Sequence, residues 1–193
     1  WLIGGNGIYT NSKSIGFSFT DFTNQLSLRR QGKGGVFFNQ SGEKDPALFV
    51  INEGGPSLLF ENNGMGVFSE KKLTDKTAEP LNDNSSSAIA DINNDGYNDI
   101  FQLHYQNFFK LYLGGNSSVF FDYTKQSGLN LSQVEPQSLI SSHFWDFNND
   151  GNLDLLISDD VNQPLFFMND GAGQFQNQII NGILLKANTR IFG

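Results

Sequence analysis

The 193-residue chain contains no cysteine and only two histidines, His104 and His143. The lack of cysteine excludes disulfide bridges, thiolate metal sites and cysteine nucleophiles. The histidines do not have the spacing of a zinc site, and no Gly-x-Ser-x-Gly sequence of a serine hydrolase is present. We therefore assign no catalytic residue and no organic cofactor, and we expect a protein that is not an enzyme.

Basic residues are also scarce, with 12 Lys and Arg against 20 Asp and Glu and a net charge of −8. The compact basic groups, around Arg29-Arg30 and Lys71-Lys72, are too small for a groove that follows a phosphate backbone, so nucleic-acid binding is not expected. No apolar run approaches the length of a membrane span, and no charged-then-apolar leader is present. Because the chain starts at Trp1, we interpret it as processed or truncated.

The most specific pattern occurs twice, in Asp91-Ile-Asn-Asn-Asp-Gly-Tyr-Asn-Asp99 and in Asp146-Phe-Asn-Asn-Asp-Gly-Asn-Leu-Asp154. Each segment places oxygen side chains at positions 1, 3, 5 and 9 around a glycine at position 6, and the carbonyl of position 7 can supply a further oxygen. An EF-hand would need Glu at position 12, where the chain has Gln102 or Ile157, and flanking helices. The flanks are short and β-prone, so the loops are expected to join strands.

The two loops are 146 − 91 = 55 residues apart, which indicates a repeat. Counting back 54 residues from Asp91 leads to Phe37-Phe-Asn-Gln-Ser-Gly-Glu-Lys-Asp45. This segment keeps Asn39 and Asp45 but has no acid at positions 1 and 5, where Phe37 and Ser41 stand. We interpret the loop around Asn39, Ser41 and Asp45 as a degenerate copy. A single loop of this kind can also be an Asx-rich turn without metal, but two copies in phase favour calcium.

Other phrases recur in step with the loops. The hairpin phrase appears as Leu59-Phe-Glu-Asn-Asn-Gly-Met-Gly-Val-Phe68, Leu111-Tyr-Leu-Gly-Gly-Asn-Ser-Ser-Val-Phe120 and Phe166-Phe-Met-Asn-Asp-Gly-Ala-Gly-Gln-Phe175, with a shorter form at residues 1–9. A second phrase, Asp-[Phe/Tyr]-Thr, occurs at Asp21 and Asp122. Repeats of this length, built from about four short strands and Gly/Asn turns, are typical of β-propeller blades, and the 19 Phe suit blades that pack face to face.

We therefore predict an all-β fold, a single partial β-propeller domain over residues 1–193. The repeats are expected at about 1–20, 21–74, 75–121 and 122–180, with the start of another at 181–193. Dividing 193 residues by 55 gives about 3.5 blades, whereas propellers usually close with about four to eight. The chain is accordingly interpreted as a segment of a larger propeller.

The loop pattern followed by an aliphatic strand, together with the hairpin phrase, resembles the FG-GAP/VCBS repeats of integrin α-subunit propellers and of many secreted bacterial proteins. The resemblance covers nearly the whole chain. It implies two Ca²⁺ ions, with position 7 acting through its backbone carbonyl. The implied ligands are Asp91, Asn93, Asp95, Tyr97 and Asp99 in the first site, and Asp146, Asn148, Asp150, Asn152 and Asp154 in the second.

The leading functional hypothesis is a non-catalytic calcium-binding propeller that is extracellular, at the cell surface or periplasmic, and used for protein binding, adhesion or assembly. One alternative is a carbohydrate-binding propeller, or the propeller of a polysaccharide-active enzyme, for which Tyr97, Tyr105 and Tyr123 are exposed aromatic candidates. Another is a building block of an extracellular filament. Trp145 is expected to pack between blades rather than stack on a sugar, and Asp159-Asp160 to be a solvated pair.

Overall fold

The structure, a computed structural model, is all-β. It describes residues 2–4, 7–11, 19–21, 32–40, 45–52, 56–65, 67–73, 84–104, 108–116, 119–132 and 139–178. The chain divides into two compact units, one formed by residues 1–73 and 77–83 and the other by residues 74–76 and 84–193. Ser41, Tyr105 and the expected start of a further repeat at 181–193 lie outside the described residues.

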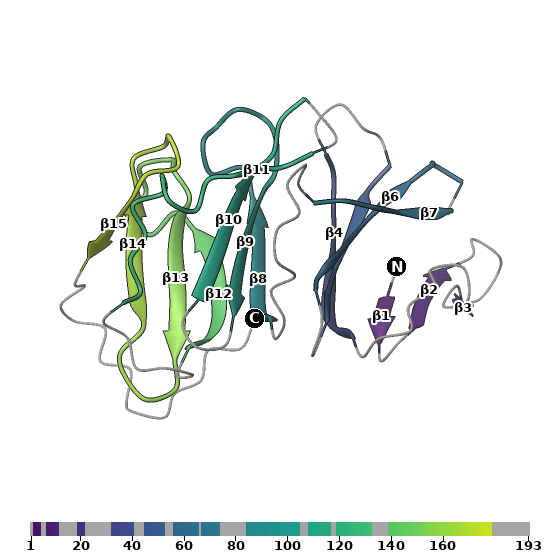
Figure 1. The fold of residues 1–193 in the computed structure, drawn as a ribbon, viewed down its shortest axis with the longest axis horizontal. Helices are drawn as coiled ribbons and strands as arrows, with labels where there is room; N and C mark the ends of the chain where they lie inside the picture. Colours follow the sequence, from purple (N-terminus) through teal and green to yellow (C-terminus); the bar gives the residue numbers. More distant parts are fainter. Residues whose placement is uncertain are drawn as a thin grey trace. The chain divides into compact units, whose positions relative to one another are not determined.

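The first unit contains two antiparallel sheets (Figure 1). The three-stranded sheet consists of β1 (Leu2–Gly4), β2 (Gly7–Asn11) and β3 (Phe19–Asp21) in sequence order. The four-stranded sheet consists of β4 (Gly32–Phe38), β5 (Ala47–Asn52), β6 (Leu58–Asn62) and β7 (Phe68–Lys71), also in order. The apolar side chains of β5 to β7, including Leu48, Phe60 and Phe68, form a small buried cluster.

The second unit contains two four-stranded antiparallel sheets (Figure 1). The first consists of β8 (Asn84–Ala90), β9 (Asp99–His104), β10 (Phe108–Leu113) and β11 (Phe121–Asp122). The second consists of β12 (Leu139–Trp145), β13 (Asp154–Asp159), β14 (Leu165–Asn169) and β15 (Phe175–Gln178). The first strands, β8 and β12, lie side by side, and the Ser142 N–H donates to the Ser86 hydroxyl oxygen at 3.0 Å.

The three four-stranded sheets share the same architecture. Each has a register shift near the start of its first strand, between Gly32 and Gly34, between Asn84 and Ser86, and between Leu139 and Ser141. Each is a meander in which consecutive strands are neighbours. The predicted all-β class and the four-stranded repeats, consistent with propeller-like blades, are thus confirmed.

The core of the second unit lies between its two sheets. Strands β9 and β13 are buried along their whole length, because a strand neighbour covers each edge and packed side chains cover each face. Phe101, Leu111, Leu155 and Phe167 are among the fully buried side chains of this cluster. Burial along the whole strand agrees with the three consecutive apolar residues at the centre of β13, 155–157, which do not alternate with polar ones.

The hairpin phrase folds as predicted in the first and third four-stranded sheets. In the β6–β7 turn the Asn62 side-chain oxygen accepts from Gly64 N, and in the β14–β15 turn the Asn169 oxygen accepts from Gly171 N, both at 3.1 Å. Gly64 and Gly171 have φ of 80° and 84°, a region that glycine enters without a Cβ penalty. The recurring Asn-x-Gly therefore has one structural role, which is to close the hairpin.

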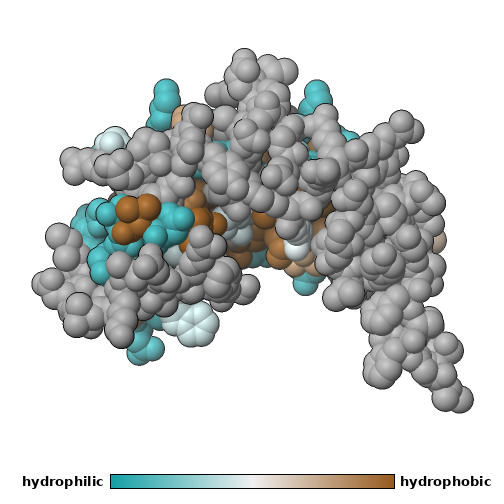
Figure 2. Space-filling model, turned by 90° about the horizontal axis from the view of Figure 1, so that it is seen from below, coloured by the Kyte–Doolittle hydropathy of each residue, from teal (hydrophilic) through white to brown (hydrophobic). Residues whose placement is uncertain are grey.

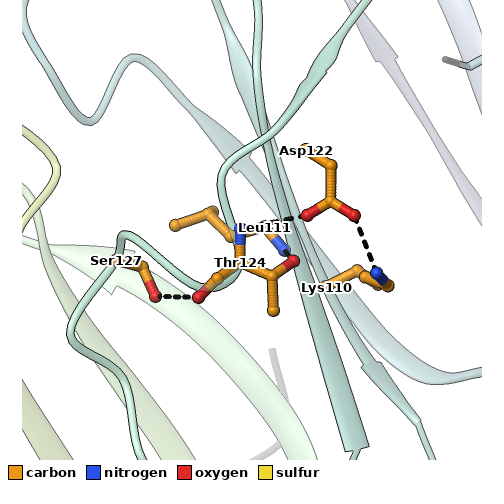
Figure 3. Close-up of polar contacts among 5 residues, drawn as sticks. All are labelled: Lys110, Leu111, Asp122, Thr124 and Ser127. Carbon is orange, nitrogen blue, oxygen red and sulfur yellow. Dashed lines mark hydrogen bonds and ion pairs between the residues drawn. The ribbon is translucent and has the colours of Figure 1, made fainter. Parts of the chain in front are cut away.

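The Asp-[Phe/Tyr]-Thr phrase at Asp122 forms a turn that follows β11 (Figure 3). Asp122 accepts from Lys110 Nζ at 2.7 Å and from Thr124 N at 3.0 Å. The Thr124 hydroxyl accepts from Leu111 N at 3.1 Å, and the Ser127 hydroxyl donates to the Thr124 carbonyl at 2.9 Å. These bonds hold the turn against β10. After the turn, the chain continues toward the next sheet.

The described residues include no helix that is long and apolar enough to cross a membrane. Large hydrophobic side chains that are exposed come from separate strands and loops: Met65, Val67, Phe108, Phe121, Trp145, Phe147 and Val161. On the face drawn in Figure 2, the hydrophobic residues that carry colour form separate patches among hydrophilic ones. Scattered exposure of this kind is ordinary for a protein surface.

Candidate calcium-binding loops

The first loop joins β8 to β9 and is organised around the carboxylate of its first residue. Asp91 Oδ1 accepts from Asp95 N at 3.1 Å, and Asp91 Oδ2 accepts from Gly96 N at 2.8 Å. Asp95 Oδ1 in turn accepts from Tyr97 N at 2.8 Å, while Asp95 Oδ2 accepts from Asn93 Nδ2 at 3.0 Å. The side chains at positions 1, 3 and 5 therefore point toward the interior of one tight loop.

The second loop, between β12 and β13, repeats these bonds one for one. Asp146 accepts from Asp150 N at 3.0 Å and from Gly151 N at 2.9 Å. Asp150 accepts from Asn152 N and from Asn148 Nδ2, both at 2.8 Å. Two segments 55 residues apart thus have the same local structure, and the pattern of side chains accounts for it.

Both loops require two left-handed residues. Asn94 and Asn149, at position 4, have φ of 58° and 59°, and Gly96 and Gly151, at position 6, have φ of 87° and 89°. Asn tolerates this region better than most residues, and Gly enters it freely. The Asn-Asp-Gly sequence at positions 4 to 6 is therefore a conformational requirement of the loop, separate from any ligand role.

The position-9 carboxylates are buried and tie each loop to its sheet. Asp99 Oδ2 accepts from Ile92 N at 2.9 Å, and Asp99 Oδ1 accepts from Gly114 N at 2.8 Å, just beyond β10. Asp154 accepts in the same way from Phe147 N at 3.0 Å and from Asn169 N at 2.9 Å. Position 9 therefore joins the loop, the start of the second strand and the end of the third.

The electrostatics of Asp99 bear on whether a cation fits. The pKa of Asp99 is raised to about 7, mainly by burial and also by the neighbouring carboxylates of Asp95 and Asp91, which together outweigh the lowering effect of the hydrogen bonds from Ile92 and Gly114. In the exposed part of the second loop, the hydrogen bonds from Asn152 N and Asn148 lower the pKa of Asp150. A divalent cation in the first loop would favour ionised Asp99, because it would offset the neighbouring negative charges.

The donor set fits calcium in its chemistry. Each loop offers carboxylate and amide oxygens, the hard donors that Ca²⁺ prefers, and a carboxylate oxygen that accepts one N–H bond retains a further lone pair. Within the described residues, no three His, Cys, Asp or Glu side chains form a metal-binding group by themselves. A full ligand set would accordingly need the position-3 amide oxygen and the position-7 carbonyl as well as the acids.

The strand register places the degenerate first loop two residues later than the sequence spacing predicted. Phe38 pairs with Ala47, just as Ala90 pairs with Asp99 and Trp145 with Asp154. Position 1 is therefore Asn39 and position 9 is Ala47, which has no oxygen side chain. Asp45 corresponds to position 7 rather than position 9. In this register the acids of positions 1 and 9 are replaced by Asn39 and Ala47, so the sequence lacked the two end markers that would have fixed the alignment.

One residue that the sequence analysis did not single out links the two loops. The Asn169 side chain, buried at the end of β14, donates through Nδ2 to the Ile92 carbonyl of the first loop at 2.7 Å. It also donates to the Leu153 carbonyl of the second loop at 2.9 Å. The signal available in the sequence was the Asn shared by the hairpin phrases at 62 and 169, which the pattern alone did not connect with the loops.

A second, exposed link joins the same loops. Asn94 Nδ2 donates to Asn152 Oδ1 at 3.1 Å and to the Gly171 carbonyl at 3.4 Å. Asn94 is at position 4 of the first loop and Asn152 at position 7 of the second. The two candidate sites therefore lie at one end of neighbouring sheets and share contacts in both their buried and exposed parts.

Three expectations for single residues need correction. Trp145 is 67% exposed and does not pack between the described sheets, although Ala90 at the same register position packs against the shared core. Asp159 is buried and accepts from Val161 N at 2.8 Å and from Asn162 N at 2.9 Å, so it closes a turn and is not solvated. Tyr123 is half-buried, and its hydroxyl accepts from Gln174 Nε2 at 2.5 Å.

Comparison with known proteins does not place the chain in a family. No protein-family model matches it, and no curated protein is significantly similar to it. The fold and the loops define an all-β protein with three four-stranded antiparallel sheets and two closely similar acidic loops.

Proposed function

We propose that the chain is part of a calcium-stabilised propeller of the FG-GAP/VCBS kind, used outside the cytoplasm for protein binding, adhesion or assembly and not for catalysis. The observation that carries this proposal is the one-for-one repetition of the loop hydrogen bonds at Asp91 and Asp146. Each loop would hold one Ca²⁺ through the oxygens at positions 1, 3, 5, 7 and 9. The ion would supply charge neutralisation and a rigid connection between the strands.

The expected energetic effect is modest. With Kd of about 10⁻⁴ to 10⁻³ M, as in extracellular calcium modules, millimolar calcium would stabilise the fold by about 0.4 to 1.4 kcal/mol per site. For a chain of this size, the sum over two sites corresponds to a rise in Tm of about 2 to 10 °C. A role in adhesion or assembly follows from this effect, because ordered loops at one end of the sheets would present a fixed surface to a partner protein.

The test is thermal unfolding of the full chain in millimolar calcium and in excess chelator, with Asp95→Ala and Asp150→Ala in parallel. Calcium should raise Tm in the unchanged chain, and each variant should lose at least half of that rise. Glu70→Ala, an exposed acid on β7, is the control for a lost charge, and it should keep the full calcium response. If Tm of the unchanged chain is the same in calcium and in chelator, the loops are metal-free turns and the proposal fails.

One observation favours a second candidate function, the binding of carbohydrate. Trp145, directly before the second loop, is 67% exposed, and Phe147 inside that loop is 36% exposed. Exposed aromatic rings beside acidic and amide side chains suit the apolar face and the hydroxyl groups of a sugar. A glycan array in millimolar calcium, with Trp145→Ala as the comparison, decides this candidate. Binding that the variant abolishes would support it, and an array without signal would remove it.

A further inference from the structure

We propose that the two calcium loops bind their ions cooperatively and that Asn169 is the positioning residue that couples them. The proposal rests on the proposed function, because it presupposes two calcium sites. It goes beyond that function by assigning a thermodynamic link between the sites and one residue that carries most of it.

The contacts of Asn169 reach both loops from one buried side chain. Nδ2 donates to the carbonyls of Ile92 and Leu153, at 2.7 and 2.9 Å, while Oδ1 accepts from Gly171 N and Gly173 N, each at 3.1 Å. These four bonds use both donors of the amide and both lone pairs of its oxygen, so the orientation of the side chain is fully determined. A buried amide with this set of partners cannot move without leaving carbonyls or N–H groups unpaired.

The backbone of the same residue touches a proposed ligand. Asn169 N donates to Asp154 Oδ1, the position-9 carboxylate of the second loop, at 2.9 Å. An ion that fixes Asp154 would therefore fix Asn169, and Asn169 in turn holds position 2 of the first loop at the Ile92 carbonyl. Position 2 lies between the proposed ligands Asp91 and Asn93. Ordering of the second loop is thus transmitted to the first through two hydrogen bonds of one residue, from Asn169 N to Asp154 and from Asn169 Nδ2 to the Ile92 carbonyl.

The other four-stranded sheet of this unit has no side chain at the place that matches Asn169. By register, Gly114 corresponds to Asn169, and its N–H likewise donates to the position-9 carboxylate of Asp99. A Cβ on Gly114 would lie 2.3 Å from the Asn98 carbonyl oxygen, which excludes an asparagine there. Asn169 is thus a buried bridge between the two loops, and Asn94 adds an exposed one.

The thermodynamic consequence is positive cooperativity. If the ion in one loop also orders part of the other loop, the second ion binds with a smaller loss of conformational entropy. Couplings between linked sites are typically about fivefold or more, and a fivefold coupling between two equal sites gives a Hill coefficient of about 1.4. By linkage, each site must raise the affinity of the other by the same factor.

The experiment is a calcium titration of the full chain by calorimetry, compared with Asp95→Ala and Asp150→Ala, which each retain one site. In the unchanged chain, half-saturation should come at a lower calcium concentration than in either single-site variant, with a Hill coefficient of about 1.4 or more. In the Asn169→Asp background this difference should largely disappear and the Hill coefficient should fall toward 1, because the aspartate keeps the acceptor for Gly171 and Gly173 but cannot donate to the two carbonyls.

Two matched controls separate coupling from general damage. Asn62→Asp makes the same change in the equivalent hairpin between β6 and β7, and it should leave the Hill coefficient unchanged. Asn94→Gly is a second test that leaves the buried amide intact: it removes the exposed link while keeping the left-handed backbone, and it should lower the coupling in part. Asn149→Gly is its control, since the structure shows no cross-sheet hydrogen bond from Asn149 to another described residue.

A second readout does not depend on two ions binding. In Asp95→Ala, whose first loop cannot hold calcium, binding at the second loop should slow amide hydrogen exchange in residues 91–99, and Asn169→Asp should abolish that protection. Two sites that titrate independently in the unchanged chain would overturn the coupling and leave the proposed function standing. A chain that binds no calcium would overturn both.

Discussion

Phe175 N donates to the Ser127 carbonyl at 2.8 Å, so the turn after β11 is bonded directly to the last strand of the next sheet. The adjacent Gly128 has φ of 74°, and a Cβ there would lie 2.7 Å from the Phe175 carbonyl oxygen. The close backbone contact and the left-handed conformation both require glycine at this position.

The first prediction follows from that contact. Gly128→Ala should lower the free energy of unfolding by about 2 kcal/mol or more, because it combines a strained φ with a clash against backbone that cannot rotate away. Gly115→Ala is the control, since a Cβ at Gly115 meets nothing within 4 Å. It should change stability by less than about 1 kcal/mol in either direction. Urea denaturation of both variants measures the difference, and equal effects would contradict the prediction.

The sequence predicted those parts of the fold that local chemistry determines. The loops at Asp91 and Asp146, and the hairpins at Asn62 and Asn169, form through hydrogen bonds to residues two to five positions away, so nine or ten residues of sequence were sufficient. The alternation of such turns with apolar strands then indicated the four-stranded repeat.

What the sequence did not predict depends on contacts between distant residues. The bond from Asn169 to Ile92 joins positions 77 apart, and no local pattern marks it. The alignment of the first loop depended on the pairing of Phe38 with Ala47, which only the sheet reveals. We expected the Trp145 ring to pack between blades because large aromatic side chains are usually buried. Whether this ring is buried depends on which parts of the fold lie against it, and the local sequence does not contain that information.

The second prediction concerns the ion pair that holds the turn at Asp122. Although partial burial raises the pKa of Asp122, the hydrogen bonds from Lys110 and Thr124 lower it to a net value below that of an ordinary Asp. Its contribution to stability is therefore present above about pH 4 and is lost as the pH falls below that value. Lys110→Met should cost about 0.5 to 1.5 kcal/mol at pH 7 and less at pH 3, measured by denaturation at both pH values.

Lys71→Met is the control for this pair. Lys71 forms a similar ion pair with Glu61 at 2.9 Å, but both side chains are more accessible to solvent than Lys110. Exposed pairs contribute little, so this variant should change stability by less than about 0.5 kcal/mol. A loss at Lys71 as large as that at Lys110 would contradict the expectation that the less accessible Lys110 forms the stronger ion pair.

The third prediction concerns Asp99 in chelator. Because its folded pKa is about 7, above the unfolded value near 4, the folded state binds the extra proton between these limits. The stability that Asp99 contributes is therefore complete below about pH 4 and is lost as the pH rises to about 7. The difference in Tm between the unchanged chain and Asp99→Asn should fall over this range in chelator. Saturating calcium should remove that slope, and a slope that persists unchanged in calcium would argue against an ion at Asp99.

The fourth prediction tests the exposure of Trp145. A side chain that is 67% exposed in the folded chain loses little packing on truncation, so Trp145→Ala should cost less than about 0.5 kcal/mol. Phe167→Ala, at a side chain that is 1% exposed in the core of the same sheet, should cost about 3 to 5 kcal/mol. Urea denaturation of the two variants gives the comparison. A cost above about 2 kcal/mol at Trp145 would mean that another surface covers the ring in solution, and sugar binding at this residue would then lose its physical basis.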